Sequence, residues 1–123
     1  MIKLLLVEDD ATLRYMIRNS LEVVIGGYEM AEAANGAEGL ELWKTFRPDI
    51  IVADVEMPVM DGYEMVAKIR ERDRLQPIVF ASGMEDPSHV MRGYEVGVNN
   101  YIKKPYLPEE LDAHVRALLR NIN

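Results

Sequence analysis

The sequence predicts an α/β fold in which a five-stranded, doubly wound parallel sheet is flanked by five helices. Apolar runs typical of strands alternate along the chain with segments whose apolar residues recur at helical spacing. Alternation of this kind is typical of a mostly parallel sheet with helices on both faces. Three of the runs are almost continuously apolar, as central parallel strands are, whereas the second and fifth are more polar and suit the edges. We therefore expect the strand order 2-1-3-4-5.

The boundaries of the elements are marked by caps and by apolar stripes. The first helix is expected to stop at Gly26 and Gly27, the second to be capped by Asn35, and the fourth to begin at Asp86 and Pro87. The expected strands cover residues 2–7, 28–33, 49–54, 77–82 and 100–104. The residues expected to face inward from the helices are, in chain order, Leu13, Ile17, Leu21 and Val24; Leu40 and Trp43; Met65, Val66 and Ile69; and Leu111, Val115, Leu118 and Ile122.

Length and composition exclude several classes of protein. The 123 residues suit a single domain spanning 1–123, and 49% hydrophobic residues are enough to fill its core. The net charge of −7 argues against direct nucleic-acid binding, which needs an excess of positive charge. The absence of cysteine excludes disulfides and thiolate metal sites. No apolar run approaches the roughly 20 residues of a membrane span and no signal peptide is visible, so we expect a cytoplasmic protein with no membrane partner.

Polar and charged residues stand where four of the expected strands end. The first strand is followed by Glu8 and Asp9, and the third, fourth and fifth end in Asp54, Ser82 and Lys104. Ligands of doubly wound sheets bind outside the carboxyl ends of the strands, near the switch point between the first and third strands. The fold should therefore gather three carboxylates, a hydroxyl and an ammonium in one shallow pocket.

The carboxylates of Glu8, Asp9 and Asp10 would repel one another without a positive partner. Oxygen ligands from a few carboxylates together with waters suit Mg²⁺, and a divalent cation would relieve the repulsion between Glu8, Asp9 and Asp54. Asp10 is expected to belong to the start of the first helix and not to the ligand set. With the metal bound, an Asp54 oxygen could attack a phosphoryl group, whose charge Mg²⁺ and Lys104 would neutralise.

Four motifs carry a resemblance to a known family. They are "LLVEDD", "DVEMPVMDG", "PIVFASG" and "KKPY", in this order along the chain. With them the sequence resembles, over its whole length, the receiver domain of bacterial two-component response regulators, which has the chemotaxis-receiver fold. The resemblance implies signal transduction by phosphorylation, in which a histidine kinase or phosphotransfer protein donates the phosphoryl group. It also implies that the domain catalyses this transfer and its own slow dephosphorylation.

The resemblance assigns the acceptor and the metal ligands to particular residues. It implies that Asp54 is the phosphoacceptor. Glu8 and Asp9 match the acidic pair that holds Mg²⁺ together with Asp54, and the backbone carbonyl of Glu56 matches the remaining protein ligand.

The resemblance also implies a set of switch residues. Ser82 matches the hydroxyl that shifts toward the phosphoryl group, and Tyr101 matches the aromatic residue that turns inward on activation. Lys104 matches the family's lysine, and its bond to Pro105 is expected to be cis. Phosphorylation would then change a protein-interaction surface formed by the fourth helix, the fifth strand and the fifth helix.

One part of the sequence departs from a subclass of the family. Receivers of the winged-helix transcription-factor class dimerise through cross-subunit ion pairs on that same surface. The positions expected to carry these charges are here Val90, Asn99, Asn100 and His114, which leaves Glu110 without its expected partner. These residues argue against that dimer. His114, like His89, has no metal-ligand spacing and is expected at the surface.

Two other functions fit part of the pattern. A phosphatase of the haloacid-dehalogenase type also uses a nucleophilic aspartate and Mg²⁺, but it needs a second aspartate two residues after the nucleophile of its first strand. Here Ala11 and Thr12 follow "EDD", and no cap domain is visible. A scaffold receiver that is not phosphorylated is the third hypothesis, and the intact set of acids, serine and lysine argues against it. The downstream partner is either a target protein or a C-terminal output domain beyond this sequence.

Overall fold

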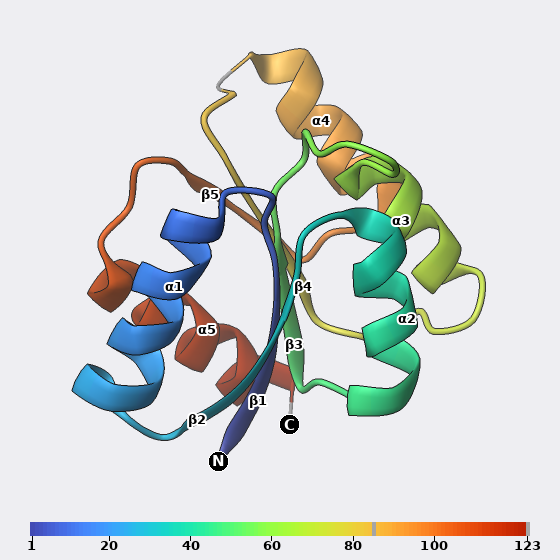
Figure 1. The fold of residues 1–123 in the computed structure, drawn as a ribbon. Coiled ribbons are helices and arrows are strands. Elements are labelled where there is room, and N and C mark those ends of the chain that lie inside the picture. Colours follow the sequence, from blue (N-terminus) through green and yellow to red (C-terminus); the bar gives the residue numbers. More distant parts are fainter. Residues whose placement is uncertain (85, 123) are drawn as a thin grey trace.

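Five parallel strands form one sheet in the computed structural model of the chain, which describes residues 1–84 and 86–122, with the side chain of residue 122 left out (Figure 1). The strands are β1 (Ile2–Val7), β2 (Tyr28–Ala33), β3 (Ile50–Ala53), β4 (Ile78–Ser82) and β5 (Asn100–Lys103). Their order is β2-β1-β3-β4-β5, which confirms the order predicted from the polarity of the strands. Every residue of β3 and β4 is buried, whereas the edge strands β2 and β5 combine buried with more exposed positions.

Helices cover both faces of the sheet. In chain order they are α1 (Ala11–Asn19), continued by a π-helix η1 (Ser20–Ile25), then α2 (Gly36–Phe46), α3 (Gly62–Arg70), α4 (Pro87–Val96) and α5 (Pro108–Ile122). Figure 1 shows α1 and α5 on one face and α2, α3 and α4 on the other. Since the strands lie between these two helical layers, the central ones are apolar at most consecutive positions and not only at alternate ones.

The hydrophobic core accordingly has two parts, one on each face of the sheet. Along β1, Leu4 and Leu6 pack in the cluster that includes residues of α1 and α5, whereas Leu5 and Val7 pack in the cluster that includes residues of α3. This division follows from the alternation of side chains along a strand. The second cluster also holds Phe80, which is fully buried.

Side-chain caps begin most of the helices where the sequence places them. Asp10, Asn35, Asp61 and Asp86 each accept a hydrogen bond from a backbone N–H in the first turn of α1, α2, α3 and α4. Such caps satisfy backbone donors that the helix itself leaves free. Each cap follows a loop that leaves the carboxyl end of a strand, so the caps also fix the geometry of that end of the sheet.

The prediction that Val24 faces inward is wrong. Its side chain is 71% exposed, whereas Leu21 on the same expected stripe is fully buried. The physical reason is the π-helix, in which the N–H of Gly26 donates to the carbonyl of Leu21, five residues earlier. The wider turn shifts the helical register, so that Ile25 packs against the core in place of Val24.

Most of the remaining expectations for the helices are confirmed. The inward residues of α3 are buried, as are Leu111 and Val115 of α5, while the expectation for Ile122 lies outside the described side chains. His114 is exposed, as expected, and His89 is half-buried, with its backbone carbonyl accepting a hydrogen bond from the Tyr63 hydroxyl at 3.1 Å. No helix in the described part of the chain is long and apolar enough to cross a membrane.

Candidate functional site

The carboxyl ends of β1, β3 and β5 converge at one edge of the sheet. Backbone hydrogen bonds continue the strand pairing one residue beyond the strands themselves. The N–H of Asp54 donates to the carbonyl of Val7 at 2.9 Å, and the N–H of Lys104 donates to the carbonyl of Ser82 at 2.8 Å. These bonds fix the backbone of Asp54 and Lys104. Their side chains are therefore positioned by the sheet and not by a mobile loop.

Lys104 connects two of the carboxylates. Its Nζ donates to a carboxylate oxygen of Glu8 and to Oδ2 of Asp54, the latter at 3.0 Å. The sequence predicted that these groups, which follow three different strands, would share a pocket. The structure brings them into direct contact.

Burial sets the electrostatics of this contact. Only 3% of Glu8 is exposed, and this burial raises the pKa of its carboxyl, although the hydrogen bond from Lys104 acts in the opposite direction. Burial alone would lower the pKa of Lys104, but its hydrogen bonds to Glu8 and Asp54 together raise it above the ordinary value. The ammonium therefore stays charged, and it compensates part of the negative charge at this end of the sheet.

The three carboxylates predicted as metal ligands lie together. One oxygen from each of Glu8, Asp9 and Asp54 falls within 4.8 Å of the others. Asp9 is exposed and Asp54 is half-buried, so the cluster opens toward solvent on one side. A set of hard oxygen donors with room for water fits Mg²⁺. The side chain of Glu56, whose backbone carbonyl was the fourth expected ligand, is exposed.

Asp10 is the carboxylate of the acidic run that does not join the cluster. Its Oδ1 accepts hydrogen bonds from the backbone N–H groups of Thr12 at 2.9 Å and Leu13 at 3.1 Å. This confirms that Asp10 belongs to the helix start. Its own N–H donates to Glu8 at 3.0 Å, which helps to hold the buried carboxylate in place.

A close backbone approach shapes the loop after Asp54. A Cβ atom at Gly62 would lie only 2.5 Å from the carbonyl oxygen of Asp54, so any other residue would displace this loop. The N–H of Gly62 also donates to the carbonyl of Val55 at 2.8 Å. The pair Asp61 and Gly62 therefore caps α3 and fixes the loop that carries the acceptor candidate.

The two predicted switch residues, Ser82 and Tyr101, both form hydrogen bonds with the backbone of Met84. Ser82 is 2% exposed, and its Oγ accepts a hydrogen bond from the N–H of Met84 at 3.1 Å. The hydroxyl of Tyr101 donates to the carbonyl of Met84 at 3.0 Å. The ring of Tyr101 also stands edge-on to Phe80, with 6.3 Å between the ring centroids. A movement of Ser82 would therefore disturb the segment that holds Tyr101.

The structure adds two residues that sequence reasoning missed. Arg14 donates to the backbone carbonyl of Glu8 and forms an ion pair with Glu32 at 3.4 Å. A positive charge in the first turn of a helix opposes the helix dipole, and this was the signal that Arg14 has a partner elsewhere. Tyr106 follows the cis peptide bond between Lys104 and Pro105, and burial together with the nearby charges of Glu8 and Asp54 raises the pKa of its hydroxyl.

The residues expected to argue against a charged dimer make contacts within the chain. Oδ1 of Asn99 accepts hydrogen bonds from the N–H of Ile78 at 2.9 Å and from Arg70 at 3.2 Å. The side chains of Asn100 and His114 lie within hydrogen-bonding distance, at 3.2 Å.

The fold and this site define a class of α/β signalling domain. A family model described as the response regulator receiver domain matches residues 4–116, so the chain belongs to that family. Solved structures of the same class superpose closely. A chemotaxis response regulator CheY4 of Vibrio cholerae is 34% identical, with a TM-score of 0.88, and the match covers 95% of this chain and 98% of that one. A CheY-like receiver domain protein from Methanospirillum hungatei has a TM-score of 0.91 at 24% identity over 99% of this chain and 96% of that one, which shows the shared fold.

Curated relatives are longer than this chain. The transcriptional regulatory protein AfsQ1 of Streptomyces coelicolor is 42% identical over 117 residues, which are 95% of this chain and 51% of that protein. A probable transcriptional regulator ycf27 of Guillardia theta is 36% identical over 121 residues, which are 98% of this chain and 46% of that protein. The chain thus spans about half the length of the curated relatives it matches. It functions as a receiver in two-component signalling.

Proposed function

We propose that this receiver accepts a phosphoryl group on Asp54 from a histidine kinase or a phosphotransfer protein. The observation that carries the proposal is the position of the Asp54 carboxylate, whose Oδ2 lies 3.0 Å from the Lys104 ammonium and which shares a cluster with the carboxylates of Glu8 and Asp9. A positive group and a group of metal-ligand oxygens beside the acceptor are what phosphoryl transfer needs.

The proposed reaction transfers one phosphoryl group without a redox change. An Asp54 oxygen forms a bond to phosphorus while the bond between phosphorus and the donor's histidine nitrogen breaks, and the electron pair of that bond stays with the nitrogen. Mg²⁺, held by Glu8, Asp9, Asp54 and the backbone carbonyl of Glu56, supplies positive charge to the phosphoryl oxygens when it is bound.

Each polar side chain of the site has a separate role in this proposal. Lys104 orients Asp54 before the reaction and neutralises a phosphoryl oxygen afterwards. The Ser82 hydroxyl gives up its bond from Met84 and turns to a phosphoryl oxygen. The receiver is thus the catalyst of its own phosphorylation and of the later hydrolysis, and it acts mainly as a switch.

The same contacts provide a route from Asp54 to the protein surface. When Ser82 releases the N–H of Met84, the segment that accepts the Tyr101 hydroxyl is no longer held, and Tyr101, whose ring stands edge-on to Phe80, can change its position. The surface of α4, β5 and α5 then changes. This surface would be recognised by a target protein or by an output domain, as in the longer relatives named as transcriptional regulators.

The test is labelling with a small phosphodonor such as acetyl phosphate, followed by the intact mass of the protein. We expect the chain to gain one phosphoryl group in the presence of Mg²⁺, and Asp54→Asn to gain none. Chelation of the metal should slow labelling by about tenfold or more, because the site then lacks most of its positive charge.

A matched control lies at the opposite end of the same strand. Asp49 precedes β3, and its carboxylate accepts a hydrogen bond from the N–H of Lys3 at 2.8 Å, which the amide oxygen of Asp49→Asn can also accept. This variant should label like the unmodified chain. Labelling that persists in Asp54→Asn would show that the acceptor is another residue.

A further inference from the structure

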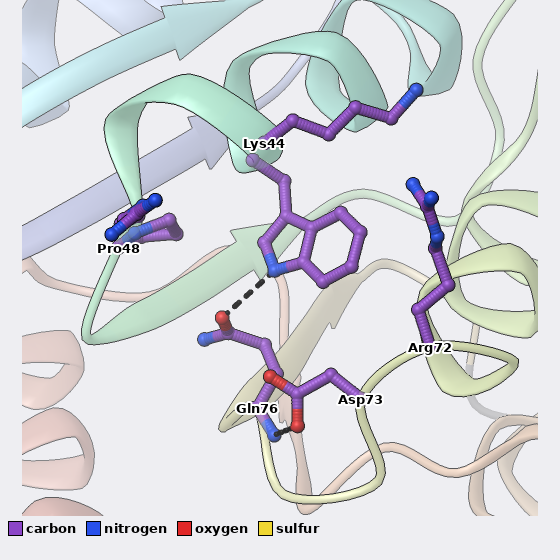
Figure 2. A pocket seen from close by; sticks show the side chains of 7 residues that line it. Lys44, Pro48, Arg72, Asp73 and Gln76 are labelled. Carbon is purple, nitrogen blue, oxygen red and sulfur yellow. Dashed lines mark hydrogen bonds between the residues drawn. The ribbon is translucent and has the colours of Figure 1, made fainter.

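The amino ends of β3 and β4, opposite the candidate phosphoacceptor, border a second hollow in the surface. It has a volume of about 500 Å³, within the range of roughly 300–1,000 Å³ that is usual for small-molecule sites. Its walls come from the carboxyl end of α2, the loop before β3 and the turn after α3 (Figure 2). We call it the Trp43 hollow. It shares no residue with the site around Asp54.

An indole ring held in a fixed orientation lines the Trp43 hollow. The Nε1–H of Trp43 donates to Oε1 of Gln76 at 3.0 Å, the bond drawn in Figure 2. Gln76 is itself 7% exposed, and its Nε2 donates to the carbonyl of Pro77 at 3.1 Å, so its amide cannot turn away. The ring also packs on the core beneath it. A fixed aromatic surface costs little entropy when a flat ligand stacks on it.

Positive charge surrounds this ring. Lys44, Arg47 and Arg72 line the hollow, and Lys44 forms an ion pair with Glu41 at 3.1 Å. Within residues 1–84 and 86–122, the guanidinium groups of Arg47 and Arg72 make no hydrogen bond and no ion pair. Figure 2 shows Lys44 and Arg72 on one side of the hollow and Pro48 on the other. On a chain with a net charge of −7, Arg47 and Arg72 are thus two neighbouring cations without a matching anion among the described residues.

The one carboxylate that lines the hollow does not neutralise these cations. Oδ1 of Asp73 accepts hydrogen bonds from the backbone N–H groups of Leu75 at 2.8 Å and Gln76 at 3.1 Å. It thus shapes the turn that presents Gln76 to the indole. Asp73 makes no ion pair with Arg47 or Arg72 among the described residues.

We propose that the Trp43 hollow binds a nucleotide, with its flat base against the indole of Trp43 and its phosphate at the rim, where Arg47 and Arg72 supply positive charge. Guanidinium groups bind phosphate in a two-pronged, charge-assisted manner, and aromatic side chains stack on any nucleobase. An inorganic anion would use only the cations. The fixed indole is what favours a ligand that joins a ring to a phosphate.

The chain carries a direct probe of this site, because it contains a single tryptophan. Its indole N–H gives one resonance in a ¹H–¹⁵N correlation spectrum, and that N–H lies at the wall of the hollow. We would titrate the ¹⁵N-labelled chain with adenosine monophosphate, guanosine monophosphate and inorganic phosphate. We expect a saturable shift with at least one nucleotide, with a dissociation constant of about 10 μM to 1 mM.

Charge-neutral variants test the role of the two guanidinium groups. Arg47→Gln and Arg72→Gln should each weaken nucleotide binding about fivefold or more, since each removes one charge-assisted contact. The matched control is Arg74→Gln, which changes an exposed arginine of the same turn that does not line the hollow, and it should change the affinity less than about twofold. Asp54→Asn should bind like the unmodified chain, so this result is independent of the phosphoacceptor.

Several outcomes would overturn the proposal. The absence of any saturable shift at millimolar nucleotide would exclude the site. Equal losses in Arg74→Gln and Arg72→Gln would indicate a non-specific charge effect. If inorganic phosphate binds as tightly as the nucleotides, then the base makes no contact and the assignment of a nucleotide is wrong.

Discussion

The two ends of the sheet carry opposite charges and differ in how those charges are balanced. At the carboxyl end, the carboxylates of Glu8 and Asp54 share the ammonium of Lys104 within the chain. At the amino end, Arg47 and Arg72 line the Trp43 hollow without a carboxylate partner among the described residues. The first site is balanced in part by a cation of the chain itself, whereas the second can be balanced only by an ion or ligand from outside.

Burial explains this difference. Only 4% of the Glu8 side chain and 20% of the Lys104 side chain are exposed, so either charge alone would be left in a poorly solvated position. Arg47 and Arg72 are exposed, and water solvates them without any partner. The stability of the fold therefore requires an opposite charge beside Glu8 at the carboxyl end. At the amino end, the lack of an opposite charge beside Arg47 and Arg72 lowers the stability little.

The largest predicted effect follows from removing the shared cation. Lys104→Met keeps most of the side-chain stem but leaves Glu8 and Asp54 without their partner, so we expect the free energy of unfolding to fall by about 2–3 kcal/mol in the absence of divalent cations. Urea unfolding curves would measure the loss. Millimolar Mg²⁺ should restore part of it, because a cation bound to the native carboxylates replaces the missing charge.

The matched variant at the other end of the sheet is Arg72→Met. It removes an exposed charge that has no partner, so its effect should stay within about 0.5 kcal/mol. Equal losses in the two variants would contradict the view that only the carboxyl end depends on internal compensation.

A smaller effect is expected from an arginine of the amino end that does have partners. Nε and Nη2 of Arg70 donate to the carbonyl of Gly97 at 2.9 and 2.8 Å, and Nη1 donates to the carbonyl of Asp73 at 3.1 Å. Burial lowers the pKa of Arg70, and the nearby charge of Asp73 opposes this shift. Arg70→Met should lower the free energy of unfolding by about 1–2 kcal/mol, because it leaves partly buried carbonyls without donors.

Urea unfolding curves of Arg70→Met and Arg72→Met would show which of these two arginines stabilises the fold. Arg70 ends α3 and Arg72 lies in the turn directly after it, and both carry the same charge, so general electrostatics predicts similar effects for both. A loss confined to Arg70→Met would show that the hydrogen-bonded contacts, and not the net charge, stabilise this end of the sheet.

Much of the fold could be predicted because it depends on local and periodic features. The order of the strands followed from their polarity, and the helix starts followed from side chains such as Asp10 and Asn35. The π-helix could not be predicted, because nothing in its composition distinguishes it from an α-helical turn, and it moved Val24 to the surface. Val59 takes a positive φ of 69°, an uncommon conformation for a β-branched residue that sequence propensities do not indicate.

The candidate site was predictable to the extent that strand ends determine it. Glu8, Asp54 and Lys104 meet because parallel strands bring their carboxyl ends to one edge. The link from Ser82 to Tyr101 through Met84 was not predictable, because it depends on the path of the loop backbone. Side-chain identity therefore indicated which groups gather, and only the structure shows how they are connected.

The last predicted effect tests whether compensation depends on the end of the sheet or on the environment of the charge. Asp112 of α5 lies beside Tyr28, the first residue of β2, at the amino end. Its carboxylate accepts hydrogen bonds from the Tyr28 hydroxyl and from Nε of Arg116, the latter at 2.7 Å. Burial by itself would raise the pKa of Asp112, but these partners outweigh it and hold the pKa below its ordinary value of 3.8.

A lowered pKa in the folded state means that the charged carboxylate stabilises the fold above the unfolded-state value, and that this contribution is lost as the pH falls through the folded-state pKa. Asp112→Asn keeps a hydrogen-bond acceptor but loses the charge, so it should cost about 1 kcal/mol near pH 7, a modest value because the pair is partly exposed. Urea unfolding of both chains between about pH 7 and pH 3 should show this difference shrinking toward the acid end. A difference that stays constant with pH would instead assign the loss to packing or hydrogen bonding. A difference that shrinks would show that the amino end also balances a charge within the chain where that charge is partly buried. Arg47 and Arg72 would then lack partners because they are exposed, and not because they lie at the amino end.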